Sequence, residues 1–305
     1  MSTRSQLKHV RVSMMNAVHD LSLLVARDEG LFREQGLDIE IVNTPGTAQV
    51  GADHQAMRDL IFDRTMESLY NTGDVDQYRM CEWGVMKRCV EAEEGGQRPA
   101  KIVALGSAMS TFAIITKPNS DFYEPEQFKD VPVAVSPYNG SHFTTLKLLE
   151  GFVAKDRIKV TNAGTMQERL KAVGKGEVAA GSFMEPWISV AQKHGFRIIL
   201  EGHSTRSEAA GDELDGPTLA AMFRAQATAA ELINRDASNY ESYFLKEAQG
   251  FLNPGELQAW RLVYGPPVPY TKERFDYTYN WMLGYPDLVT EGATYENSVD
   301  NRAWE

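Results

Sequence analysis

The chain has few cysteines, no long apolar run and no excess of basic residues. Only two of its 305 residues are cysteines. No stretch of about 18 consecutive apolar residues occurs, so we expect no membrane span. Acidic residues outnumber basic ones by 42 to 31, and the net charge of −11 argues against nucleic acid and anionic membranes as partners. A small anionic ligand stays compatible with this balance, because a helix end or a single cation can dominate a pocket.

The cysteines and the first nine residues indicate the cellular compartment in which we expect the protein. Cys81 and Cys89 would lie about 12 Å apart along one helix, too far for a disulfide. Two unpaired thiols are typical of a reducing compartment. Residues 1–9, MSTRSQLKH, contain no apolar run that could form the core of a signal peptide. We therefore expect a cytoplasmic protein; the alternative is a periplasmic protein whose signal peptide has been removed.

The hydrophobic pattern at the start of the chain predicts an α/β fold. Residues 10–15 are typical of a strand, residues 21–35 of an amphipathic helix, and residues 37–41 of an alternating strand. Such a unit is a right-handed crossover whose first loop lies at the carboxyl end of a strand, where α/β folds bind ligands. His19 and Asp20 are expected in that loop, which points to a small-molecule site.

Similar units follow along the chain. Further strands are expected at residues 75–80, 101–105, 112–116, 131–135, 158–161, 178–182 and 196–200. Helices are expected at residues 57–70, 83–92, 142–153, 166–173, 187–193, 225–235, 240–248, 254–263 and 270–283. A polar, glycine-rich excursion is predicted at residues 202–217.

Several segments resemble the nitrate/sulfonate/taurine-type solute-binding proteins. They are LLVARDEGLFREQGLDIEIV at 23–42, GDVD at 73–76, VAVSPYNGS at 133–141, GEVAAG at 176–181 and EPW at 185–187. The fungal thiamine-pyrimidine synthase belongs to this family, and the biphenyl sulfinate desulfinase shares its fold. The resemblance implies a two-lobed α/β fold, like a type II periplasmic binding protein, with the ligand cleft between the lobes. It places residues 1–108 and 204–305 in lobe I, and residues 109–203 in lobe II.

Gly140, Ser141 and His142 are expected to open a helix directly after a strand. Free N–H groups and the positive end of the helix dipole favour an anion at such a place. In the resembled family this turn commonly holds the carboxylate, sulfonate or phosphate of the ligand. The alternative is that Ser141 only caps the helix.

Other ligand-binding candidates are expected at strand ends or where the chain crosses between lobes. Asn16 follows the first strand, while Ser110 and Thr111 lie at a predicted crossing and could also form an ordinary loop. Trp83 could stack on the ligand. The resemblance places Glu185 and Trp187 in one wall of the cleft, and the alternative for both tryptophans is core packing.

Cys81, Glu82 and His19 are the candidate catalytic residues. Cys81 and Glu82 follow the strand predicted at 75–80, where a thiol and a carboxylate could serve as nucleophile and acid or base. His19 could transfer protons. The alternative is that Cys81 is a small buried hydrophobe; Cys89 is expected in the core.

Two functions follow. The first is a cytoplasmic enzyme, a lyase or hydrolase acting on a small aromatic or heterocyclic anion. The alternative is a receptor of a nitrate/sulfonate-type ABC transporter, with a permease as partner and no catalysis. The desulfinase's cysteine follows an asparagine, whereas this chain has Ala17 after Asn16, so that nucleophile is absent. We expect no metal and no cofactor, since zinc-ligand spacings and nucleotide fingerprints are missing; a homodimer is left open.

Overall fold

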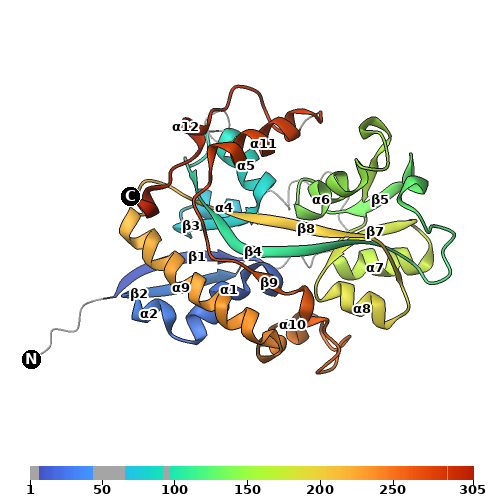
Figure 1. The fold of residues 1–305 in the computed structure, drawn as a ribbon, viewed down its shortest axis with the longest axis horizontal. Coiled ribbons are helices and arrows are strands. Elements are labelled where there is room, and N and C mark those ends of the chain that lie inside the picture. Colours follow the sequence, from blue (N-terminus) through green and yellow to red (C-terminus); the bar gives the residue numbers. More distant parts are fainter. Residues whose placement is uncertain (1–6, 44–65, 92–95, 287) are drawn as a thin grey trace, which may run out of the picture. The chain divides into compact units, whose positions relative to one another are not determined.

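Strands and helices alternate along most of the chain, as the sequence predicts for an α/β protein (Figure 1). The computed structural model describes residues 7–43, 66–91, 96–286 and 288–305. Contacts between residues divide the chain into two compact units. The first comprises Met1–Ala108, Thr205–Asp236 and Val263–Glu305, and the second comprises Met109–Ser204 and Ala237–Leu262. None of the helices in these described ranges is long and apolar enough to cross a bilayer.

Parallel strands organise the first unit. β1 (Lys8–Met14) pairs in parallel with both β2 (Leu37–Asn43) and β3 (Gln77–Cys81). β3 then pairs antiparallel with the end of the long strand β8 (Arg197–Ala210). The other elements of this unit are α1 (Ala17–Asp28), α2 (Leu31–Glu34), α4 (Met66–Asn71), α5 (Glu82–Glu91), α9 (Gly216–Arg235), β9 (Val263–Tyr264), α11 (Lys272–Leu283), α12 (Tyr295–Ser298) and η5 (Arg302–Trp304).

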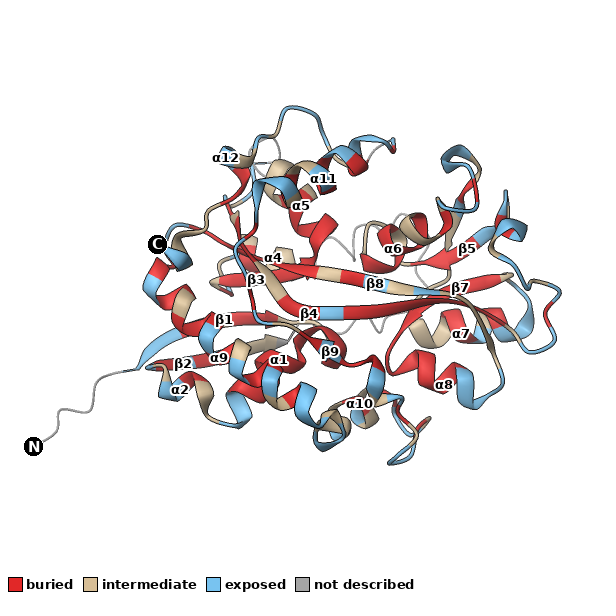
Figure 2. Cartoon of the chain, viewed as in Figure 1, coloured by how far each residue is buried: buried red, intermediate tan, exposed pale blue. Residues whose placement is uncertain are grey.

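The predicted strand–helix–strand opening is confirmed, but its loop is shorter than expected. Asn16 caps α1 by accepting a hydrogen bond from the N–H of His19, so the helix begins at Ala17. His19 and Asp20 therefore lie in the first helical turn and not in a loop. Gly30, with φ of +78°, separates α1 from α2, where one continuous helix was expected. Residues 17–26 are all buried (Figure 2), and α1 and α2 pack against α9.

Two long strands stand where the sequence pattern predicted two shorter strands and a polar excursion. β4 (Lys101–Thr116) is one strand where two were expected. β8 continues to Ala210, through most of the predicted excursion at 202–217. Its polar residues lie opposite residues of β3, Arg206 opposite Cys81 and Glu208 opposite Arg79, and all four are buried. Polarity in this segment therefore marks a buried charge cluster and not a loop.

A second parallel arrangement organises the other unit. β5 (Pro132–Val135) lies between β6 (Lys159–Asn162) and β7 (Ala180–Met184), in parallel with both. β7 also pairs antiparallel with β4. The remaining elements are α6 (Gly140–Leu149), α7 (Met166–Lys175), α8 (Trp187–Lys193), α10 (Glu241–Glu247), η1 (Pro125–Phe128), η2 (Lys155–Arg157), η3 (Ala237–Tyr240) and η4 (Ala259–Arg261).

Residues 237–262 belong to the second unit, whereas the predicted boundaries assigned them to lobe I. The helix expected at 254–263 is reduced to the short turn η4. Arg261 makes ion pairs with Glu185, at 3.2 Å, and with Glu201, at 3.1 Å. The backbone N–H of Gln258 donates to Ser189 Oγ at 2.9 Å. These bonds join residues far apart in the sequence, so local periodicity does not encode them.

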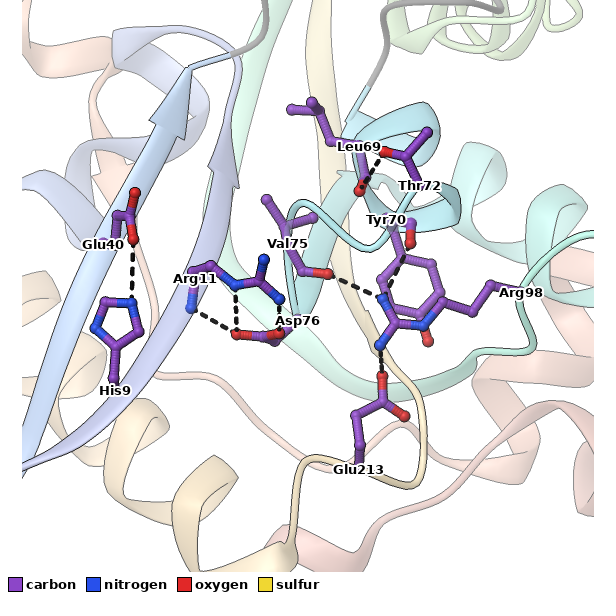
Figure 3. A network of polar contacts seen from close by, with 10 residues as sticks. All are labelled: His9, Arg11, Glu40, Leu69, Tyr70, Thr72, Val75, Asp76, Arg98 and Glu213. Atoms are coloured by element: carbon purple, nitrogen blue, oxygen red, sulfur yellow. Dashed lines mark hydrogen bonds and ion pairs between the residues drawn. The ribbon is translucent and has the colours of Figure 1, made fainter.

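A polar network in the first unit ties β1 and α4 to the loops around them (Figure 3). Arg11 donates to both carboxylate oxygens of Asp76, at 2.6 Å from Nη2 and 3.4 Å from Nε. The guanidinium of Arg98 lies over the ring of Tyr70, 4.2 Å from its centroid, and is paired with Glu213. Because each of these charges has a partner, we interpret the network as structural.

Candidate functional site

The turn between β5 and α6 is closed by side-chain hydrogen bonds that leave some of its hydrogen-bond donors without an acceptor in the described ranges. β5 ends at Val135, and Asn139 caps α6 by accepting a hydrogen bond from Gly140 N–H at 2.6 Å. The N–H of Ser136 donates to Ser141 Oγ at 2.9 Å, which closes the turn on itself. Ser141 is therefore not the cap residue that the alternative interpretation made it. Gly140 and Ser141 stand in the first turn of a ten-residue helix, as predicted.

Two donors of this turn lack an acceptor within the described ranges. One is the N–H of Ser141, in the helix turn whose N–H groups have no intrahelical partners. The other is the hydroxyl proton of Ser136, a residue that is partly exposed. The Ser141 N–H belongs to the positive end of the α6 dipole. An oxyanion is a chemical group to which both could donate hydrogen bonds.

His142 contributes no charge to this turn. Its Nδ1 accepts a hydrogen bond from the N–H of Tyr138 at 3.1 Å, which leaves the ring proton on Nε2. Burial lowers the pKa of His142 to about 4, so the ring is neutral at pH 7. The predicted role of His142 as a ligand contact stays a prediction, and any contact that it makes is through a neutral ring.

Arg169 is a functional candidate that the sequence reasoning missed. It lies on α7, its side chain is fully buried, and its Nη2 donates to Ser136 Oγ at 2.7 Å. No carboxylate of the described ranges is within ion-pair distance of it. A signal was available, because Arg169 falls on the apolar face formed by Met166, Leu170 and Val173. An arginine is almost never fully buried unless it is paired.

The loop after β1 in the first unit is fixed by Asp20. One carboxylate oxygen of Asp20 accepts hydrogen bonds from the N–H groups of Met15, at 2.8 Å, and Asn16, at 3.2 Å. Its other oxygen lies 3.5 Å from Nη1 of the buried Arg79. Asp20 and Asn16 therefore shape this loop, and ligand binding by Asn16 stays a prediction.

His19 and Cys81 lie in the field of one buried arginine, Arg206. Burial and then the charge of Arg206 hold the pKa of His19 well below its usual value. Burial raises the pKa of the Cys81 thiol to about 11, although the Gly84 N–H and Arg206 act in the opposite direction. The structure thus places the two predicted catalytic groups around a common cation. A protonated thiol is not the form that nucleophilic catalysis requires, whereas a neutral imidazole can still accept a proton.

Glu82 has its carboxylate fully engaged inside the first unit. It accepts hydrogen bonds from Tyr270 at 2.7 Å, Thr278 at 2.8 Å, Thr205, and Arg274 at 2.7 and 2.5 Å. Burial alone would raise the pKa of Glu82, but Arg274 and the hydroxyls outweigh it and lower that pKa. These partners give the carboxylate a structural role, and the predicted role of Glu82 as an acid or base stays a prediction.

Trp83, Trp187 and Glu185 have packing and structural partners. The ring of Trp83 lies 5.7 Å from that of Trp281, and the ring of Trp187 lies 5.8 Å from that of Phe251. Glu185 is buried, paired with Arg261, and accepts the Ser189 N–H at 3.2 Å. Their predicted contacts with a ligand stay predictions.

Ser110 and Thr111 are also buried, in β4. Thr111 Oγ1 lies 3.3 Å from His203 Nδ1 and 3.4 Å from the Arg261 carbonyl. The Ser110 hydroxyl has no partner in the described part of the chain. In the same part, no group of three or more His, Cys, Asp and Glu side chains is placed to hold a metal ion.

No family model matches the sequence, and no curated protein matches it. Solved structures resemble it over nearly its full length. The alkanesulfonate-binding protein of Xanthomonas axonopodis pv. citri, bound to MOPS, gives a TM-score of 0.72 at 15% identity and covers 97% of this chain and 99% of that chain. A Candida albicans protein with the generic periplasmic binding protein fold gives 0.69 at 13%, covering 97% of both chains. A desulfurization enzyme gives 0.60 at 12%, covering 96% of both. The predicted periplasmic-binding-protein-like fold is confirmed.

Proposed function

We propose that this chain is a solute-binding protein that holds a small organic anion, such as an alkanesulfonate, and does not transform it. The observation that carries the proposal is the turn before α6, where the Ser141 N–H and the Ser136 hydroxyl have no acceptor in the described ranges. The fold is compatible, because the Xanthomonas protein that binds alkanesulfonates shares it. A receptor of this kind is the alternative that we drew from the sequence.

The enzyme hypothesis receives less support from the residues predicted for it. Cys81 is buried and its pKa is raised, while Glu82 is engaged by four side chains. Covalent chemistry would need a thiolate that can be reached by substrate, and the geometry favours binding over catalysis. The cytoplasmic location expected from residues 1–9 stays a prediction.

Calorimetric titration with 1-hexanesulfonate tests the proposal, with 1-hexanol as the uncharged ligand of equal chain length. We expect saturable binding of the sulfonate, and binding of the alcohol that is at least about tenfold weaker, because a charged hydrogen-bond partner contributes about 1.5–3 kcal/mol. After prolonged incubation the sulfonate should be recovered intact by mass spectrometry. Release of sulfite would support the enzyme hypothesis instead. If neither 1-hexanesulfonate nor MOPS binds, the proposal is wrong.

Ser141→Pro locates the anion. The substitution removes the N–H of Ser141 while keeping a residue that the first turn of a helix accepts. Glu273→Pro is the matched control, since Glu273 is exposed and holds the same position in the first turn of α11. We expect Ser141→Pro to weaken sulfonate binding by about tenfold or more and Glu273→Pro to leave it unchanged. Equal affinity of both variants would place the anion elsewhere.

A further inference from the structure

Arg169 is a buried cation without a counter-charge in the described part of the chain. Its guanidinium donates to the Ser182 carbonyl at 2.5 Å, to Ser136 Oγ at 2.7 Å and to the Gly164 carbonyl at 3.3 Å. All three acceptors are neutral, and Nε has no partner in the described ranges. Burial lowers the pKa of Arg169 to about 10, so the side chain is still charged at pH 7. Buried charges are normally paired, so one without a partner needs an explanation.

The chain makes room for this arginine. Gly181 in β7 lies against its aliphatic stem, and a Cβ atom at Gly181 would come within 3.0 Å of Arg169 Cγ and Cδ. The guanidinium also lies 5.9 Å from the centroid of the Phe183 ring. Arg169 is therefore held firmly in one position, with Nη2 directed at the turn before α6.

The direction of the hydrogen bond decides what Ser136 can do. A guanidinium has no acceptor, so Ser136 Oγ must accept from Arg169 Nη2. The hydroxyl proton of Ser136 is then left for another acceptor, and the cation behind the oxygen makes that proton a stronger donor. The Ser136 N–H cannot compete for this acceptor, since it is used by Ser141 Oγ.

We propose that Arg169 is a positioning residue for anion binding, which acts through Ser136 and supplies the positive charge that the bound anion neutralises. This inference rests on the proposed function. The anion would accept hydrogen bonds from the Ser136 hydroxyl and the Ser141 N–H, one hydroxyl group away from the guanidinium. Both groups act as hydrogen-bond donors, and neither requires the ligand to donate in return. The site therefore suits a fully ionised oxyanion such as a sulfonate.

A double-mutant cycle with 1-hexanesulfonate as the calorimetric probe tests this role. The variants are Arg169→Met, Ser136→Ala, the double variant and the conservative Arg169→Lys. Lys171→Met is the matched control, because Lys171 is an exposed cation on the same helix. We expect each of Arg169→Met and Ser136→Ala to weaken binding by about tenfold or more. The loss in the double variant should be clearly smaller than the sum of the two single losses. Arg169→Lys should recover part of the affinity, and Lys171→Met should bind like the parent chain.

The outcomes separate this role from a structural one. If the losses of the two single variants add, or if Ser136→Ala binds like the parent chain, Arg169 does not act through Ser136 and the inference is wrong. If Arg169→Met does not fold, judged by circular dichroism, the same cycle is run with Arg169→Lys, where additive losses would equally overturn the inference. A parent chain that binds no organic anion overturns the proposed function itself, whereas binding that ignores Ser136 overturns only this inference.

Discussion

Arg274 holds the carboxylate of Glu82 by both of its oxygens. Nε of the arginine donates to Oε1 at 2.7 Å, and Nη2 donates to Oε2 at 2.5 Å. Arg274 lies on α11 and Glu82 at the start of α5, so this bidentate pair joins α11 to α5 within the first unit. The pair gives Glu82, which the sequence made a catalytic candidate, a structural role in this unit.

Replacing Glu82 by Gln should therefore lower stability and not ligand affinity. The amide cannot accept from all four donors, so we expect a loss of about 1.5–3 kcal/mol in the free energy of unfolding, the range for hydrogen bonds to a charged group. Because the folded pKa of Glu82 is lowered, its contribution is present above the unfolded value and is lost as the pH falls through the folded value. Urea unfolding at pH 7 and pH 4 measures both effects. If the variant unfolds like the parent chain but fails to bind 1-hexanesulfonate, Glu82 acts in ligand binding and the structural role is wrong.

Both cysteines should react slowly in the folded protein. Burial raises the pKa of Cys81 to about 11 and that of Cys89 to about 12, so very little thiolate exists near neutral pH. Iodoacetamide labelling at pH 7.5, read by mass spectrometry, should be slow for each thiol and fast after unfolding in urea. The variants Cys81→Ser and Cys89→Ser isolate one thiol each, and both should keep sulfonate binding. Rapid labelling of Cys81 in folded Cys89→Ser would revive the prediction that it is a nucleophile.

The sequence predicts the features that depend on near neighbours. The periodicity of Leu21, Leu24 and Val25 identifies a buried helix. Gly36, which precedes the next strand, has a left-handed conformation with φ of +79°, one that glycine adopts readily. A helix after the strand at 131–135 is also predicted, although it begins at Gly140 and not at His142. Short-range patterning is enough for these, because it fixes which face is buried.

The rest depends on residues that meet only after folding. Arg206 looks like part of a polar loop until Cys81 and His19 are placed around it. Arg169 becomes a functional candidate only through its hydrogen bond to Ser136, 33 positions earlier in the chain. Glu82 is a catalytic candidate in the sequence, but in the fold its carboxylate accepts hydrogen bonds from Arg274 and Tyr270 of the C-terminal region. Local sequence does not report such long-range partners, and they decide whether a charged group is functional or structural.

His9 should make stability depend on pH near neutrality. Its ring nitrogens lie 3.2 Å from Asp38 and 3.1 Å from Glu40 on the neighbouring strand, and the Glu40 contact is drawn in Figure 3. The hydrogen bond with Asp38 is the main reason that the pKa of His9 is raised. Its contribution should be fully present below the unfolded pKa of about 6.5 and should fade as the pH rises through the folded value. His9→Gln should remove this part of the difference in melting temperature between pH 5.5 and pH 8.5. An NMR titration giving a pKa at or below 6.5 would contradict the expectation.

Arg261 should be the residue that holds residues 237–262 in the second unit. It is buried between Glu185 and Glu201, and Glu185 is itself fully buried. Arg261→Met would leave the Glu185 carboxylate without a cation, so we expect a loss of about 3–5 kcal/mol in the free energy of unfolding at pH 7. Limited proteolysis should then cut within residues 249–258 before the rest of the unit.

The pH dependence of Arg261→Met distinguishes a lost ion pair from lost packing. Burial already raises the pKa of Glu185, and removing Arg261 should raise it further. A carboxyl with a raised folded pKa costs most when it is ionised, so the loss should be large at pH 7 and smaller near pH 4.5, where protonation relieves it. Lys193→Met is the control, since the pair of Lys193 with Glu256 is about one-third exposed and should contribute at most about 1 kcal/mol. A loss for Arg261→Met that matches this control, or that stays the same at both pH values, would show that the ion pair does not anchor the segment.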